Sequence, residues 1–177
     1  EVFEDLEFKA SQRNIQLIFK TGAGQNFQVL ADREYLRQVL MNLVTNSIKY
    51  GKENGATKVS FYDMDKNVLV EVADSGIGIS EKHLKHLFDR FYRVDKSRSR
   101  EQGGSGLGLS MVYGFARQSG GTVEIQTNPE SGTNVVLYLP RTHAAHRHLA
   151  EPLAASTGPA GGETILLIED EPDVRQM

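Results

Sequence analysis

Two short stretches of this chain combine polar side chains and glycines in a way that core packing does not require. Asn42 and Asn46 lie four residues apart, so a helix would place both amides on one face. Asp74 directly precedes the Gly76-Ile77-Gly78 sequence. A carboxylate at this point can accept a hydrogen bond from the amino group of a flat base, and glycines let the backbone approach that base closely.

Phosphate chemistry is indicated by a glycine-rich stretch, residues 104–108, that precedes a helical pattern. Backbone N–H groups at a helix N-terminus bind phosphate. The stretch differs from a Walker loop because no Gly-Lys-Ser/Thr follows, and from a dinucleotide loop because Leu109 stands where the third glycine would be. Asparagine oxygens are suitable ligands for Mg²⁺. Lys49 and Tyr50 extend the asparagine stripe toward phosphate, and Arg93 could neutralise its charge. Together the stretches predict a site for ATP with Mg²⁺.

Each stretch also has a simpler interpretation. The asparagines could form a solvated polar helix face, and Asp-Ser-Gly is ordinary turn chemistry. Lys96, Arg98 and Arg100 are more simply explained as a solvated basic loop. The histidines show no arrangement typical of a hydrolase, and those at 143, 146 and 148 fall in a stretch without apolar periodicity.

Several secondary structure elements must position these residues. Residues 1–10 are typical of the end of a helix arriving from a preceding helical region. Two short strands around Leu17 and Val29 are expected, joined by a turn at 22–24. Asp32 predicts the cap of a helix over 33–50 that ends at Gly51, with Leu36, Leu40, Leu43, Val44 and Ser47 on its inner face.

The second half of the sequence predicts two hairpins and two helices. The first hairpin turns at 63–67 and ends at Asp74, and the second turns at 128–132 and ends at Pro140. A helix capped by Ser80 is expected to run through Phe91, because Leu84, Leu87, Phe88 and Phe91 follow helical spacing. A loop over 93–105 then leads to a helix that starts at 106 or 107 and ends at Gly120.

Composition limits the function classes. The 177 residues are 39% hydrophobic and 24% charged, which is typical of a globular protein. The net charge of −3 gives no general attraction to nucleic acid or anionic membrane, and neither partner is expected. The absence of cysteine excludes disulfides and thiolate metal sites. No apolar run is long enough to span a bilayer.

Taken in order, these motifs resemble the catalytic and ATP-binding domain of bacterial sensor histidine kinases, over about residues 12–140. The stretches Asn42–Tyr50, Asp74–Ile79, Leu87–Tyr92 and Gly104–Ser110 resemble that family's N, G1, F and G2 boxes, and Gly132-Thr133 its last glycine motif. The resemblance implies a Bergerat ATP-binding fold, an α/β (α+β) two-layer sandwich. Its mixed, mainly antiparallel sheet would carry helices on one face.

The resemblance also implies roles. Asn46 would ligate Mg²⁺, and Asn46 and Lys49 would be catalytic. Asp74 would read adenine. The remaining ATP-binding positions would be Asn42, Tyr50, Gly76, Gly78, Ile79, Phe91, Arg93, Gly104, Gly106, Leu107, Gly108, Leu109 and Thr133. The domain would donate the γ-phosphoryl group of ATP to a histidine on a dimerisation and phosphotransfer domain that precedes residue 1.

After Pro140 the composition changes. Residues 141–162, rich in Ala, His, Pro and Gly, are expected to be a linker. Residues 163–177 resemble the truncated start of a response-regulator receiver domain, in which Glu169 and Asp170 would help to hold Mg²⁺. The parent protein would then be a hybrid kinase, and its partner a receiver domain or response regulator. This fragment would be cytoplasmic, with any membrane anchor upstream.

Two other functions stay open at this point. The chain could be a pseudokinase that binds nucleotide or docks proteins without catalysis. It could also be a related ATPase that drives conformational change, like the gyrase and chaperone relatives.

Overall fold

The computed structural model describes residues 1–21, 28–94 and 106–142. The elements, in chain order, are α1 (Val2–Ser11), β1 (Gln16–Thr21), β2 (Gln28–Val29), α2 (Arg33–Tyr50), β3 (Ala56–Met64), β4 (Asn67–Asp74), α3 (Glu81–Leu84), α5 (Gly108–Gln118), β5 (Thr122–Asn128) and β6 (Gly132–Thr142).

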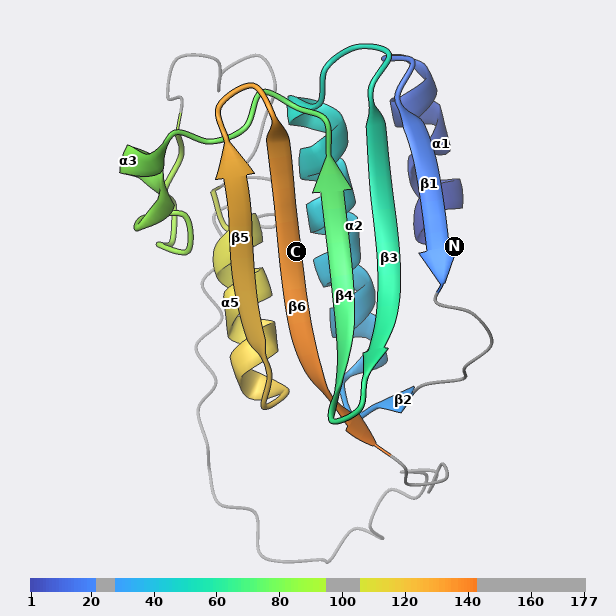
Figure 1. Cartoon of the computed structure of the whole chain (residues 1–177), viewed down its shortest axis with the longest axis vertical. Helices are drawn as coiled ribbons and strands as arrows, with labels where there is room; N and C mark the ends of the chain where they lie inside the picture. Colours follow the sequence, from blue (N-terminus) through green and yellow to red (C-terminus); the bar gives the residue numbers. More distant parts are fainter. Residues whose placement is uncertain (22–27, 95–105, 143–177) are drawn as a thin grey trace, which may run out of the picture. The chain divides into compact units, whose positions relative to one another are not determined.

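The strands form one mixed sheet in the order β1-β3-β4-β6-β2, and β5 also pairs with β6 (Figure 1). Strand β1 runs parallel to β3, whereas the other pairs are antiparallel. Helices α1, α2 and α5 lie on one face of this sheet (Figure 1). The expected mixed, mainly antiparallel sandwich with helices on one face is therefore confirmed.

Helix α2 has the expected limits because its two ends carry the expected signals. The Asp32 side chain accepts a hydrogen bond from the Tyr35 amide at 2.8 Å, and Gly51 is the C-terminal cap. The inner face also includes Val39 and Ile48, two buried residues outside the expected set. The buried hydroxyls of Ser47 and Thr57 lie 2.6 Å apart and join α2 to β3.

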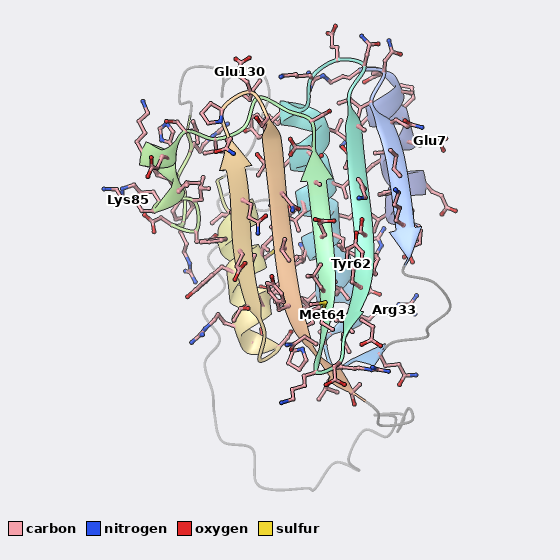
Figure 2. All side chains as sticks on the ribbon, viewed as in Figure 1. Glu7, Arg33, Tyr62, Met64, Lys85 and Glu130 are labelled. Carbon is pink, nitrogen blue, oxygen red and sulfur yellow. The ribbon has the colours of Figure 1, made fainter. Side chains whose placement is uncertain are left out.

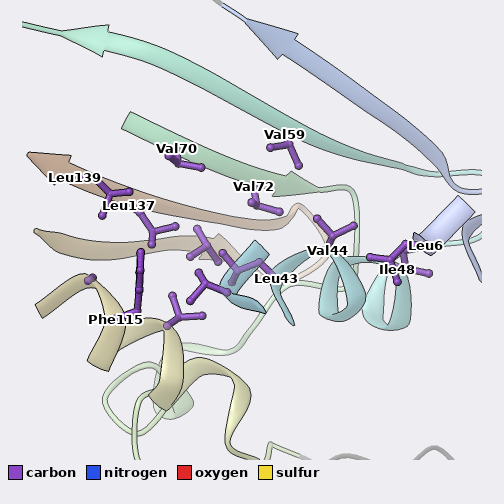
Figure 3. Close-up of a cluster of buried hydrophobic side chains, with 14 of the residues drawn as sticks. Leu6, Leu43, Val44, Ile48, Val59, Val70, Val72, Phe115, Leu137 and Leu139 are labelled. Atoms are coloured by element: carbon purple, nitrogen blue, oxygen red, sulfur yellow. The ribbon is translucent and has the colours of Figure 1, made fainter. Parts of the chain in front are cut away.

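The core lies between the helices and the sheet (Figure 3). Strands β3, β4 and β6 contribute alternate residues such as Val59, Val70 and Leu137, and α5 contributes Phe115. Helix α1 buries Leu6 and Ala10 in the same core. The apolar alternation of the strands therefore faces the helical layer, as a half-buried sheet requires.

The opposite face of the sheet has no helix over it among the described residues, and it carries more polar side chains (Figure 2). Tyr62 is partly exposed there. On the same face Asn134 donates a hydrogen bond to Glu71 at 2.8 Å across the β4–β6 pair.

The helix expected from Ser80 through Phe91 is wrong in its length. Helix α3 ends at Leu84, and the chain continues in turns with bonds such as Leu87 N–H to Leu84 O at 3.3 Å. These bonds span three residues, so side chains three apart still share one side and imitate helical spacing. Phe91 itself has a φ of 64°, which ends any right-handed helix before it.

Strands β1 and β2 are both present, but they pair with β3 and β6 and not with each other. The turn expected between them at 22–24 lies outside the described residues. Strand β6 continues through Arg141 and Thr142, two residues that we expected in the linker. Across the described ranges, no helix is both long and apolar enough to cross a membrane.

Candidate nucleotide site

The carboxylate of Asp74 sits where β4 ends. Its Oδ1 atom accepts hydrogen bonds from the amides of Gly76 at 2.8 Å and Thr133 at 3.1 Å. Burial raises the pKa of this carboxyl above its ordinary value, and the two backbone hydrogen bonds oppose that rise in part. Two amides thus fix the orientation of the carboxylate, which suits it to recognise a donor on a ligand.

Two glycines allow close contact between the turn before β6 and the loop that follows Asp74 (residues 75–79, called the Asp74 loop). Gly132 has a φ of +90°, and a Cβ atom there would lie 1.9 Å from the Asp74 carbonyl oxygen. Gly78 has a φ of +68°, and its Cβ would lie 1.9 Å from the carbonyl oxygen of Asn128. Any side chain at either position would collide with backbone, so the turn before β6 can press against the loop only with glycine.

Thr127 joins the loop after Asp74 to the turn before β6, a role that its position in the sequence did not indicate. Its hydroxyl accepts from the Ile79 amide at 2.9 Å and lies 2.9 Å from the Gly132 carbonyl, to which it donates. The Thr133 hydroxyl is 3.2 Å away. A threonine in an alternating strand gives no signal that separates this role from ordinary strand packing.

The asparagine pair lies beside the start of α5. A Cβ atom on Gly108 would be 3.6 Å from Nδ2 of Asn46 and 3.7 Å from Oδ1 of Asn42. The first turn of a helix leaves backbone N–H groups without partners inside the helix, and these attract anions. The structure thus brings the side-chain amides of one sequence motif together with the helix N-terminus of another, and this group is called the asparagine cluster below.

Tyr50 connects this cluster to the Asp74 loop. Its carbonyl oxygen accepts from the Ile77 amide at 3.3 Å, and a Cβ on Gly76 would lie 2.6 Å from that oxygen. The ammonium of Lys49 lies 5.4 Å from the centre of the Tyr50 ring. The last turn of α2 therefore contacts the loop that carries the carboxylate.

The remaining predicted residues differ in their contacts and exposure. The Phe91 amide donates to the Gly106 carbonyl at 3.1 Å, whereas the Phe91 side chain is 69% exposed. Leu107 is exposed, and Leu109 packs partly against the core. Arg93 is half-buried. Gly104 lies outside the described residues.

Metal binding here would rely on amide oxygens. Within residues 1–21, 28–94 and 106–142, no group of three or more His, Cys, Asp or Glu side chains is placed to hold a metal. Mg²⁺ shares its coordination with water and substrate phosphates and so does not need a carboxylate cage. The amide oxygens of Asn42 and Asn46, beside a phosphate-attracting helix end, therefore fit that ion.

The fold defines an α/β sandwich, and these contacts gather groups suited to a nucleotide beside the end of β4 and the start of α5. The family described as histidine kinase-, DNA gyrase B-, and HSP90-like ATPase matches residues 31–143, and the chain belongs to this family. It is an ATP-binding catalytic domain of the two-component sensor histidine kinase type.

Among curated proteins, it is similar to the sensor-like histidine kinase SenX3 of Mycobacterium tuberculosis, with 35% identity over 144 residues. The match covers 81% of this chain and 35% of SenX3, so the chain spans about a third of that relative.

Solved structures show the same similarity. The catalytic domain of the histidine kinase ThkA is 34% identical with a TM-score of 0.68, and the match covers 78% of this chain and 87% of that one. ThkA has also been solved in complex with the response regulator TrrA. Full-length ShkA in complex with AMPPNP is 27% identical with a TM-score of 0.71, over 82% of this chain and 29% of ShkA.

Proposed function

We propose that this domain binds ATP across the Asp74 loop and the asparagine cluster and donates the γ-phosphoryl group to a histidine of a separate domain. The observation that carries the proposal is the contact between the two halves of the site. The last turn of α2 holds Ile77 through the Tyr50 carbonyl, and the same helix places Asn42 and Asn46 against Gly108.

Adenine recognition would come from Asp74, with Gly76, Gly78, Ile79 and Thr133 around it. Oδ1 is already engaged by two amides, so Oδ2 is the oxygen for the exocyclic amino group of the base. An acceptor held by buried hydrogen bonds discriminates against a base that lacks the donor, because its own desolvation then goes uncompensated.

Phosphate binding would come from the first turn of α5, with Gly104, Gly106, Leu107, Gly108 and Leu109, and from the end of α2, with Lys49 and Tyr50. Asn46, supported by Asn42, would hold Mg²⁺, which when bound supplies positive charge to the phosphates. Phe91 and Arg93 would border the phosphate-binding part of the site. Phosphoryl transfer depends mainly on positioning and on neutralising charge, and these residues supply both.

The acceptor would be a histidine on a dimerisation and phosphotransfer domain that precedes α1. The ThkA–TrrA complex supports a response regulator or receiver domain as the next partner. We assign residues 12–140, extended by Arg141 and Thr142 at the end of β6, to the catalytic domain. Residues up to 162 would form a linker. Residues 163–177 would be the start of a receiver domain, which would make the parent a hybrid kinase. The location would be cytoplasmic.

The first test is a calorimetric titration of ADP and an ATP analogue, with Mg²⁺, into the wild-type chain and Asp74→Asn. Asparagine can still accept from the Gly76 and Thr133 amides, but its NH₂ group faces the amino group of adenine. We expect binding to the wild type and a loss of about 100-fold or more in the variant, the size of effect seen when a buried acceptor is mismatched. Asp65→Asn, in the turn before β4, is the matched control and should bind normally.

Transfer is tested by adding an isolated phosphoacceptor domain to wild type and to Asn46→Asp with ATP. We expect phosphorylated acceptor only with the wild type, while Asn67→Asp, at the start of β4, keeps the transfer. Nucleotide binding without transfer would favour the docking module. Steady ATP hydrolysis without an acceptor would favour the conformational ATPase.

A further inference from the structure

Arg13 caps the C-terminal end of α2, although it lies 35 or more positions away in the sequence from the residues that its guanidinium contacts. Its Nη1 donates to the carbonyls of Ile48 at 2.5 Å and Lys49 at 2.6 Å, and its Nη2 donates to Gly51 at 2.9 Å. The last carbonyls of a helix lack partners within the helix and carry partial negative charge. A guanidinium placed on two of them, and on the carbonyl of the capping residue Gly51, neutralises that end of α2.

The backbone around Arg13 is fixed by the same region. The Ile15 amide donates to Ala10 at 2.9 Å, which closes the turn after α1. The Arg13 carbonyl accepts from Asn54 at 3.4 Å, and the Gln16 amide donates to Gly55 at 2.9 Å. The turn between α1 and β1 and the loop after α2 therefore form one hydrogen-bonded unit, with the guanidinium inside it.

The turn that Arg13 caps is the part of α2 that meets the nucleotide site. It contains Lys49 and Tyr50, and the Tyr50 carbonyl holds the Ile77 amide. If this turn frayed, that carbonyl would move and the Asp74 loop would lose its anchor on α2.

We propose that Arg13 is a positioning residue for nucleotide binding. Of the predicted nucleotide site it contacts the backbone carbonyl of Lys49, and it faces no nucleotide group itself. It keeps the last turn of α2 helical, so that the asparagine cluster and the Asp74 loop hold the spacing that one ATP molecule bridges. The inference rests on the proposed nucleotide binding. Arginine suits this role better than lysine because its planar fork reaches several carbonyls at once, whereas an ammonium is a single point charge.

The test is a calorimetric titration of ADP, with Mg²⁺, into the full chain as wild type, Arg13→Ala, Arg13→Lys and Arg117→Ala. Arg117 is exposed in the last turn of α5 and serves as the matched control. We expect the dissociation constant to rise about tenfold in Arg13→Ala, the ratio that loss of a helix-end charge can produce, with Arg13→Lys in between and Arg117→Ala unchanged.

Hydrogen exchange separates a local effect from a general loss of stability. In Arg13→Ala the exchange of the Ile77 amide should accelerate by a larger factor than that of the Val70 amide in the centre of β4, whereas a general loss of stability would accelerate both by the same factor. Where Arg13→Ala does not fold, Arg13→Gln takes its place.

The outcomes separate this inference from the proposed function. A lower melting temperature with an unchanged dissociation constant would overturn the positioning role and leave nucleotide binding intact. Absence of ADP binding to the wild type would instead overturn the proposed function. The Ile77 exchange rate would then still test the cap, and an unchanged rate would reject it.

Discussion

At the scale of single residues, the buried carboxylate of Asp74 makes the stability of the domain depend on pH. Its pKa is raised above 3.8 in the folded state by desolvation, which the hydrogen bonds from Gly76 and Thr133 offset in part. The folded state therefore holds this proton to a higher pH than the unfolded chain does. Its stabilising contribution is complete below 3.8 and is lost as the pH rises through the raised pKa.

We therefore expect the free energy of unfolding of the wild type to fall relative to Asp74→Asn as the pH rises from 3.8 through the raised value. Asparagine keeps the acceptor for the two amides but has no charge to desolvate. Urea unfolding of both proteins across this pH range measures the difference. A constant difference, or one that changes in favour of the wild type as the pH rises, would contradict the assigned cause.

Residue types and spacing indicated the chemical groups of the candidate site, but not the residues that hold those groups in place. Asn42, Asn46, Asp74 and Gly108 belong to short motifs that the sequence displays directly. Thr127 contacts Ile79, which is 48 positions away in the chain, and Arg13 contacts residues that are 35 or more positions away. Neither residue type is unusual where it stands. Such contacts depend on strand pairing that one sequence does not reveal.

At the scale of elements, two glycines in different surroundings test whether close backbone contact stabilises the turn before β6. Gly132 is packed against backbone, whereas Gly114 has room for a methyl group beside it. An alanine at Gly132 would meet backbone and adopt a φ of +90°, whereas an alanine at Gly114 would meet only the Tyr35 hydroxyl at 3.8 Å, within helix α5. We expect Gly132→Ala to lower the free energy of unfolding by about 2–3 kcal/mol or more. Gly114→Ala should raise it by about 0.5–1 kcal/mol.

Thermal or urea unfolding of the two variants measures both effects. Equal effects from both substitutions would show that the packing of the β5–β6 turn against Asp74 contributes little. ADP binding should fall only in Gly132→Ala, because only that glycine lies beside the Asp74 loop.

Elements with strong end signals were predicted well, and those without them were not. Helix α2 has Asp32 at one end and Gly51 at the other, and its limits agree with the structure. The segment after Ser80 has no comparable stop signal, and over so few residues a period of three cannot be separated from one of 3.6. The helix predicted from Ser80 is therefore longer than α3.

At the scale of the whole molecule, Arg141 ties the end of β6 to the β3–β4 hairpin. Its Nη1 donates to both carboxylate oxygens of Asp63 at 2.9 and 2.7 Å, and its amide donates to Lys66 at 2.9 Å. Both side chains are mostly buried. The contact joins the last described residues of the chain to a turn formed by its middle.

We expect Arg141→Ala to lower the free energy of unfolding by about 1–2 kcal/mol, less than a fully buried pair would lose because water still reaches both groups. A double-mutant cycle with Asp63→Asn isolates the pair. Additive effects of the two substitutions would mean that the ion pair does not couple the hairpin to β6. ADP affinity should stay unchanged, since the contact lies at the end of β4 opposite Asp74.

The order of the sheet has a consequence for biosynthesis. Strand β6 comes last among the described strands, yet it pairs with β4 on one side and β5 on the other, and its end holds β2. While a ribosome is still making residues 132–142, β4 has an open edge and β5 has no partner. The nascent chain therefore carries exposed strand edges until residues 132–142 have been made and have left the ribosome, and a translational pause just before β6 would prolong the state most prone to aggregation.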